Sequence, residues 1–270
     1  MQIREYRTSD CELLGVISDK GQPANCATVR SNYLLKRGDD MKTIGLLGGM
    51  SWESTVHYYQ IINEEVQDKL GGLHSAKIAL YSVEFSEIEQ YQSSGQWEKC
   101  GEILGKAAKG IETAGADFIL ICTNTIHKVA PQIASMIQIP IIHIADTTAD
   151  ELEKCGIRRV GLLGTKYTMT QDFYKNRLAD RGIEVLVPDT ADVDVINTVI
   201  FEELCVGKIN EESRKEFQRI IGELREKGAE GVILGCTELG LLIRQSDVSV
   251  PLFDTTVIHA KKAVQIALAD

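Results

Sequence analysis

The sequence of 270 residues contains no apolar run as long as the roughly 18–20 residues that a transmembrane helix needs. It also lacks the uninterrupted apolar stretch of a signal peptide near its start. These absences lead us to expect a cytoplasmic protein. Its seven cysteines include no CxxC pair and no Cys/His spacing typical of zinc. We therefore expect free thiols, most of them small core residues, and no metal site.

Basic residues are outnumbered by acidic ones. The chain has 29 Lys and Arg residues against 39 Asp and Glu residues, so its formal net charge is −10. Such an acidic chain has no bulk attraction to nucleic acid or to anionic lipid. The pair Gly48-Gly49 forms neither a GxGxxG pattern nor a Walker A loop, which speaks against a nucleotide cofactor. No lysine has a context that singles it out for a Schiff base. We expect a small-molecule ligand, no cofactor, and no nucleic-acid or membrane partner.

The first forty residues carry none of this net charge, because their six basic and six acidic side chains cancel. They show no sustained helical or strand periodicity. A clear strand pattern begins only at 43–47, directly after Met41. We therefore predict a poorly ordered leader over 1–40 and a folded body from Met41 onward. The alternative is a short helix packed on the body, which only 13–17 would support.

The body contains an internal duplication. Three stretches recur in the same order and at similar offsets of 116, 113 and 111 positions. They are 43–49 with 159–165, 115–123 with 228–236, and 139–142 with 250–253. A repeat of about 115 residues is too long for a solenoid unit and indicates two similar domains.

Each half alternates short, glycine-bounded apolar strands with helical patterns, which is typical of buried parallel strands with right-handed crossovers. We predict an α/β fold of two pseudo-symmetric domains, each with a central, mainly parallel sheet flanked by helices. The predicted domains are 41–140 plus 252–270, and 141–251. The predicted helices are 52–70 with Ser51 as N-cap, 100–114, 145–154, 170–181, 197–205 and 211–227.

In parallel sheets, ligands bind beyond the carboxyl ends of the strands. The central strand of the first half ends in Thr123-Asn124-Thr125, and its counterpart ends in Cys236-Thr237-Glu238. The ungapped register places Thr123 opposite Cys236. If the halves face each other, a small anionic ligand would lie between these two residues, held by backbone N–H groups, hydroxyls and an amide. Cys236 alone could be a packing thiol, but its place in a repeated polar loop favours catalysis.

Other residues near these loops have simpler interpretations. Cys122 lies one position before the matched site, so its side chain turns to the other face of the strand and we expect a structural role. His127 is either a satisfied buried histidine or a proton relay. Lys128 and Lys166 could be solvated surface charges. Asp146 and Asp254 could simply cap helices.

The motifs in 48–50, 123–127 and 235–238, namely Gly-Gly-Met, Thr-Asn-Thr-Ile-His and Gly-Cys-Thr-Glu, resemble the aspartate/glutamate racemase family of cofactor-independent amino-acid racemases. The resemblance runs over about 41–270 in the order of the family. The longer string Gly-Gly-Met-Ser-Trp-Glu-Ser-Thr at 48–55 resembles the bacterial subgroup of L-aspartate/glutamate-specific racemases.

This resemblance implies two α/β domains with a site in the cleft, a homodimer, and one thiol on each face of the substrate Cα. The chain departs from that pattern at Thr123, where the family carries cysteine. The resemblance also implies a set of substrate-binding residues. These are Met50, Gln92, Thr123, Asn124, Thr125, Thr165, Cys236, Thr237 and Glu238.

The expected reaction interconverts L- and D-aspartate or glutamate by Cα proton transfer. Cys236 would be the base on one face, and Thr123, directly or through water, the donor on the other. Two-thiol aspartate racemases often carry arginine at the place of Gln92, so the neutral amide leaves room for a broader amino-acid range. The alternatives are a broad-range racemase or related isomerase, and a non-catalytic protein that binds acidic amino acids. A periplasmic-type binding protein is disfavoured by the absent export signal.

Overall fold

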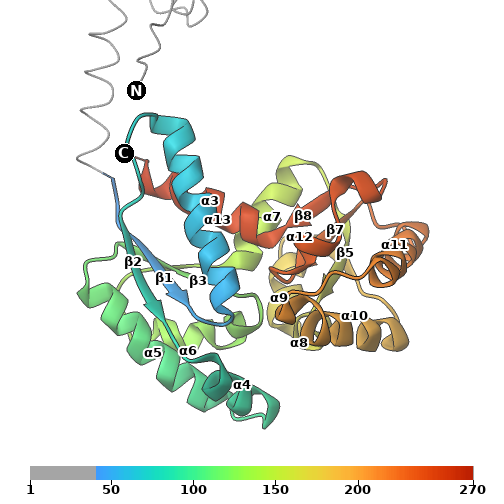
Figure 1. The fold of residues 1–270 in the computed structure, drawn as a ribbon, viewed down its shortest axis with the longest axis horizontal. Helices are drawn as coiled ribbons and strands as arrows, with labels where there is room; N and C mark the ends of the chain where they lie inside the picture. Colours follow the sequence, from blue (N-terminus) through green and yellow to red (C-terminus); the bar gives the residue numbers. More distant parts are fainter. Residues whose placement is uncertain (1–40, 270) are drawn as a thin grey trace, which may run out of the picture. The chain divides into compact units, whose positions relative to one another are not determined.

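The computed structural model describes residues 41–269 and is drawn in Figure 1. The predicted leader over 1–40 lies outside the described residues. Within 41–269 the strands form two separate four-stranded parallel sheets with helices packed around each, so the predicted α/β class with two related halves is confirmed. No helix in this part of the chain is both long and apolar enough to cross a membrane.

The first sheet has the strand order β2-β1-β3-β4. Its strands are β1 (Ile44–Gly48), β2 (Ile78–Ser82), β3 (Phe118–Ile121) and β4 (Ile141–Ile142). The helices of this lobe are α3 (Trp52–Leu70), α4 (Phe85–Ser93), α5 (Trp97–Thr113), the 3-10 helix η1 (Thr125–Val129) and α6 (Ala130–Ala134). β1 is buried along its whole length, and so is β3, which explains their continuous apolar sequences.

The second sheet has the matching order β6-β5-β7-β8. Its strands are β5 (Arg159–Gly164), β6 (Glu184–Leu186), β7 (Gly231–Gly235) and β8 (Leu252–Asp254). The helices that follow β4 in the chain are α7 (Ile144–Lys154), α8 (Lys166–Thr170), α9 (Asp172–Ala179), α10 (Thr190–Glu202), η2 (Leu204–Val206), α11 (Glu211–Glu226), α12 (Leu239–Leu242), η3 (Gln245–Asp247) and α13 (Thr255–Ala267).

The strand pairing reproduces the offsets of the sequence duplication. Ile44 pairs with Phe118 in the first sheet, and the residues 116 and 113 positions later, Val160 and Gly231, pair in the second. The edge strands follow the same rule, since β3 pairs with β4 as β7 pairs with β8. The two halves therefore share one register, in which position 123 corresponds to position 236.

The chain changes lobes after the fourth strand of each sheet, slightly later than the predicted boundaries. The strand Ile141–Ile142 belongs to the first sheet, and Leu252–Asp254 to the second. The helix after each of these edge strands then crosses over. α13 packs against α3 of the first lobe and against α7, as Figure 1 shows in red and blue. The finer division into domains remains a prediction.

The predicted helices are found with altered ends in several places. The helix over 52–70 has the predicted bounds, and the Ser51 side chain accepts the N–H of Ser54 as its N-cap. The pattern at 170–181 is interrupted, because α8 ends at Thr170 and α9 begins at Asp172. The helix predicted over 197–205 begins earlier, at Thr190, and ends at Glu202. Asp254 caps α13 as considered, whereas His143 caps α7 and Asp146 lies in its first turn.

One glycine shapes the loop after β1. Gly49 has a φ of +93°, and a Cβ added there would lie 2.3 Å from the backbone oxygen of Val83. Its N–H donates to the Thr55 hydroxyl at 2.8 Å, so the loop is tied to the helix that it precedes. Only glycine fits this conformation and this approach. The loop in turn places Met50 and Ser51 at the end of the sheet.

Three buried histidines lie together beside the loop that follows β3. The ring centroids of His127 and His143 are 4.4 Å apart, and those of His127 and His259 are 5.9 Å apart. His127 accepts the backbone N–H of Ile144 at Nε2 (3.2 Å), so its proton is on Nδ1, which donates to the backbone oxygen of Thr123 (2.8 Å). This ring ties the Thr123 loop to the start of α7.

The third ring joins α13 to the first lobe. His259 donates from Nε2 to the backbone oxygen of Ile142 (2.8 Å) and accepts the Tyr58 hydroxyl at Nδ1 (2.8 Å). Burial disfavours the charged form of all three rings. It lowers the pKa of His127 well below its ordinary value, that of His143 to about 3 and that of His259 to about 4.

We expect the free energy of unfolding to fall as the pH is lowered from about 6.5 to about 4, because the unfolded chain then binds protons on histidines that the folded chain keeps neutral. Urea unfolding over this pH range measures the effect. In His259→Asn, unfolding should take up about one proton fewer over this pH range, so the free energy of unfolding should depend less steeply on pH, whatever the substitution does to stability at neutral pH. His57→Asn, at a partly exposed position of α3, is the matched control. An unchanged slope in His259→Asn would contradict the assignment.

Candidate active site

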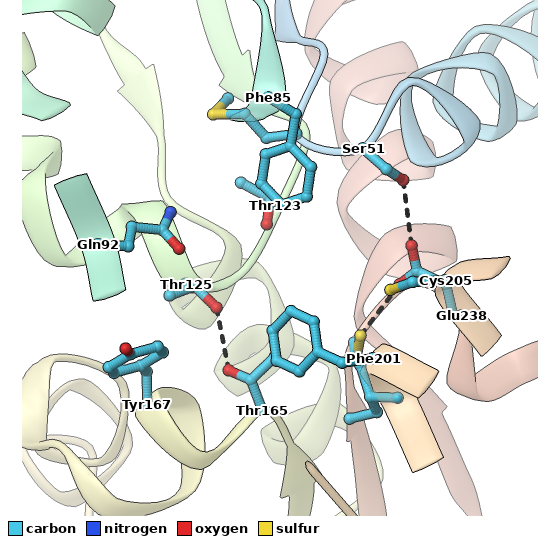
Figure 2. A pocket seen from close by; sticks show the side chains of 13 residues that line it. Ser51, Phe85, Gln92, Thr123, Thr125, Thr165, Tyr167, Phe201, Cys205 and Glu238 are labelled. Atoms are coloured by element: carbon cyan, nitrogen blue, oxygen red, sulfur yellow. Dashed lines mark hydrogen bonds between the residues drawn. The ribbon is translucent and has the colours of Figure 1, made fainter. Parts of the chain in front are cut away.

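A pocket lies where the carboxyl ends of four central strands meet, two from each sheet. The loop after β1 contributes Met50 and Ser51, and the loop after β3 contributes Thr123 and Thr125. In the second lobe, Thr165 and Tyr167 follow β5, while Cys236 and Glu238 follow β7. The remaining lining residues are Phe85, Gln92, Ile200, Phe201 and Cys205 (Figure 2). The duplication thus supplies the same two loops from each half.

The carboxylate of Glu238 connects both lobes at one side of the pocket. Its Oε1 accepts the hydroxyls of Ser51 and Ser54 from α3 and its cap, both at 3.1 Å. Its Oε2 accepts the Thr237 hydroxyl at 2.6 Å and the Cys236 thiol at 3.0 Å. Four donors on one buried carboxylate fit the ionised form, which is an acceptor only. The negative charge is therefore held beside the thiol. Figure 2 shows the hydrogen bond between Ser51 and Glu238.

Burial and this carboxylate together favour the protonated form of the neighbouring thiol. Removal from water raises the pKa of Cys236 well above its ordinary value, and the charge and hydrogen bond of Glu238 raise it further. Cys205 lies in η2 and lines the same pocket. Burial raises its pKa to about 12, with Glu238 and Glu53 adding to the effect. The resting site therefore presents a proton on Cys236 rather than a thiolate.

The opposite loop presents a hydroxyl where the second half has this thiol. Thr123 is partly exposed in the pocket, and its backbone is fixed by the hydrogen bond from His127. Asn124 is buried and donates from Nδ2 to the Thr255 hydroxyl at 3.0 Å. Cys122 is fully buried, and burial raises its pKa, in keeping with the structural role predicted for it. Cys122 is not among the described residues that line the pocket.

A second polar contact crosses between the lobes at the other side of the pocket. The hydroxyls of Thr125 and Thr165 are 3.1 Å apart (Figure 2). Thr125 occupies the position in the first lobe that Glu238 occupies in the second. Thr165, the partner of Thr125, caps the helix after the first strand of the second lobe. Ser51, a partner of Glu238, caps the helix after the first strand of the first lobe. The two contacts are therefore related by the internal symmetry of the chain.

Seven of the nine residues predicted for the site line the pocket. The other two, Asn124 and Thr237, support the loops from behind through hydrogen bonds to Thr255 and Glu238. The prediction missed Ser51 as a lining residue, although its helix-capping position was recognised. It also missed several lining residues outside the repeated strand ends. These are Phe85, Tyr167, Ile200, Phe201 and Cys205.

Residues 41–269 contain no group of three or more His, Cys, Asp or Glu side chains that could hold a metal ion. Glu238 is the only Asp, Glu, Lys or Arg among the described residues that line the pocket. The chemistry that these residues can perform on their own is proton transfer between a thiol, a carboxylate and hydroxyls.

Comparison with known proteins identifies the family. A model of the family described as Asp/Glu/Hydantoin racemase matches residues 47–263, which is most of the chain. The chain belongs to the Asp/Glu/hydantoin racemase family. At this level it is an enzyme of the isomerase class, and racemisation is the reaction that the family name describes.

Solved structures agree with the assignment to this racemase family. A Yersinia pestis protein described as a candidate Asp/Glu racemase is 52% identical, with a TM-score of 0.81, and the match covers 85% of this chain and 100% of that one. An aspartate racemase homologue from Pyrococcus horikoshii OT3 is 42% identical, with a TM-score of 0.75, covering 84% and 99%. Among curated proteins, the broad specificity amino-acid racemase RacX of Bacillus subtilis (strain 168) is 24% identical over 84% of this chain and 98% of its own length.

The contact between Glu238 and Cys236 predicts how the racemase thiol reacts. We expect alkylation of Cys236 by iodoacetamide to be slow at about pH 8 and to rise with pH without a plateau, because the thiolate is scarce. Glu238→Gln removes the neighbouring charge and should speed alkylation about tenfold, since each pKa unit changes the thiolate fraction tenfold. Peptide mass spectrometry follows the reaction, with exposed Cys155 as the internal reference. Equal or slower alkylation in Glu238→Gln would show that the carboxylate does not hold the thiol proton.

Proposed function

We propose that the protein is a cofactor-independent amino-acid racemase that moves the Cα proton between Cys236 and Thr123. The observation that carries this proposal is the shared register of the two sheets. It brings a thiol and a hydroxyl to equivalent strand ends, one in each lobe, on a single pocket. A planar carbanion held between them can lose and regain its proton on opposite faces.

On the thiol face, the proposed step begins from the resting hydrogen bond. The Cys236 proton passes to the Glu238 carboxylate, and the sulfur takes the Cα proton of one enantiomer. The C–H electron pair moves into the α-carboxylate, which hydroxyls and backbone N–H groups around the pocket can stabilise. Because the thiol pKa is raised, the base is formed only when Glu238 accepts the proton. The reverse step delivers the thiol proton to Cα.

On the other face, Thr123 completes the exchange. The proton comes from its hydroxyl directly, or from a water that the hydroxyl holds. The proton left on Glu238 then passes to solvent, and solvent returns a proton to Thr123 or its water, which restores the resting site. A hydroxyl is a poorer base than a thiolate near neutral pH, so the two directions differ at saturation. The ratios kcat/KM for the two enantiomers remain equal, because their equilibrium constant is one. The preferred hand therefore shows in kcat and in KM taken separately.

The proposed mechanism is the same whether the substrates are acidic amino acids or a wider range of amino acids. Aspartate and glutamate are the substrates that the family resemblance implies, and the broad specificity of RacX makes a wider range the alternative. A homodimer and a cytoplasmic location likewise stay predictions. A catalytically silent binding protein would bind an amino acid without exchanging its Cα proton.

Deuterium exchange at Cα in D₂O tests the racemase proposal. Each enantiomer in a panel of acidic and neutral amino acids is incubated with the enzyme, and incorporation is followed by NMR and chiral chromatography. Cys236→Ala should lower exchange by about 10³-fold or more, because removing an essential acid–base group costs at least its catalytic contribution. Cys155→Ala, at an exposed position, is the matched control. Full exchange in Cys236→Ala, or none in the unaltered protein, would overturn the proposal.

The threonine face has its own test. Thr123→Cys should bring the two directions closer to equal kcat, because each face then carries a thiol. Thr123→Val, which keeps the shape and removes the hydroxyl, should abolish racemisation while leaving Cα exchange on the Cys236 face. Such exchange retains the configuration of the substrate. Unchanged racemisation by Thr123→Val would exclude Thr123 from proton transfer.

A further inference from the structure

One hydroxyl behind the pocket contacts both of the loops that carry the proposed acid–base groups. Thr255, the first residue of α13, is fully buried, and its hydroxyl donates to the backbone oxygen of Leu234 at 2.9 Å. The same hydroxyl accepts a hydrogen bond from Nδ2 of Asn124 at 3.0 Å. Asn124 directly follows Thr123, and Leu234 lies two residues before Cys236. Thr255 therefore links the loop after β3 to the end of β7, and so connects the two lobes.

The chemistry of the three groups fixes the direction of these hydrogen bonds. A backbone oxygen only accepts, so the single hydroxyl proton of Thr255 points to Leu234, and an oxygen lone pair receives the amide of Asn124. The other end of that amide, Oδ1, is buried without a hydrogen-bond partner among residues 41–269. Within the described chain, the bond to Thr255 is therefore the one that orients the Asn124 side chain.

The matching threonine of the other half makes a different contact. The Asp-Thr-Thr sequence at 254–256 recurs at 146–148, so Thr147 is the sequence counterpart of Thr255. Thr147 is buried as well, but its hydroxyl donates to the backbone oxygen of Ile144 within α7 at 2.9 Å. The bridge between the two loops is therefore particular to Thr255 and does not follow from the repeat alone.

The two linked loops are anchored unequally. On the thiol side, the Glu238 carboxylate accepts four hydrogen bonds, one of them from the thiol itself. The loop of Thr123 is instead held by single hydrogen bonds, from His127, to Thr165 and to Thr255. Loss of the Thr255 hydroxyl should therefore displace the Thr123 loop more than it displaces the thiol.

We propose that Thr255 is a positioning residue of this racemase, whose hydroxyl holds Thr123 at the separation from Cys236 that proton return on the second face requires. This inference rests on the proposed function. Thr255 is not among the described residues that line the pocket, so it acts through Asn124 and through β7. Because a misplacement of about 1 Å can slow a step by about 10²-fold, a small movement of the loop is enough to impair this step.

Isotope exchange separates this role from a general effect on folding. In D₂O, each variant acts on the amino acid, from the panel that tests the racemase proposal, that the unaltered protein exchanges fastest. Chiral chromatography with mass spectrometry gives the ratio of inverted to retained deuterated product. Thr255→Val keeps the shape but removes both hydrogen bonds. It should lower this ratio about tenfold, because inversion needs Thr123 in place whereas exchange with retention needs only the thiol. Thr255→Ser keeps the hydroxyl and should restore the ratio to within about twofold.

Thr147→Val is the matched control, because it removes a buried hydroxyl that bonds within α7, and it should leave the ratio unchanged. Thermal unfolding checks that each variant is folded. If Thr255→Val does not fold, Thr255→Cys takes its place, and its weaker donor should lower the ratio by about threefold or more. An equal fall of inversion and retention in the folded variant, which leaves the ratio unchanged, would overturn the inference and leave the racemase proposal intact. No exchange by the unaltered protein would overturn both.

Discussion

The site depends on the hydrogen bonds that the buried carboxylate of Glu238 accepts. It accepts hydroxyls from Ser51 and Ser54 in one lobe, and it accepts Thr237 and the Cys236 thiol in its own lobe. One group thus connects the two lobes at the pocket, and its charge and hydrogen bond add to the effect of burial in raising the pKa of the Cys236 thiol. The contact between the lobes and the protonation of Cys236 are therefore linked through a single residue.

The internal duplication explains how such a site can arise and where it has diverged. Equivalent loops place Thr123 opposite Cys236, and Thr125 is the counterpart of Glu238. Each half still offers a helix-capping hydroxyl to the opposite half. What differs is the chemistry, because a hydroxyl pair at one end replaces the carboxylate and thiol at the other. The scaffold is symmetric, while the proton transfer that we propose is not.

Much of the fold could be predicted from the sequence, because buried parallel strands and capped helices leave strong local patterns. The helix at 52–70 and the register of the repeat are examples. Seven residues that line the pocket were also predictable. Six of them follow repeated strands, and Gln92 was implied by the family resemblance alone. Phe85, Phe201 and Cys205 were not predictable, because α4, α10 and η2 lie outside the three stretches whose sequences match between the halves. Their positions depend on how helices pack over the strand ends, which no local pattern encodes. The charge of the pocket wall was equally hidden, since Lys128 and Lys166 lie near site residues in sequence but bind elsewhere.

The most direct test of the central claim is a crystal structure of the protein with an amino acid bound. The account predicts the substrate Cα between the two loops, with the Cys236 sulfur and the Thr123 hydroxyl oxygen on opposite faces and each within about 3–4 Å, as reacting atoms require. A bound amino acid with both groups on the same face of Cα, or with Thr123 out of reach of Cα and of any bridging water, would contradict it.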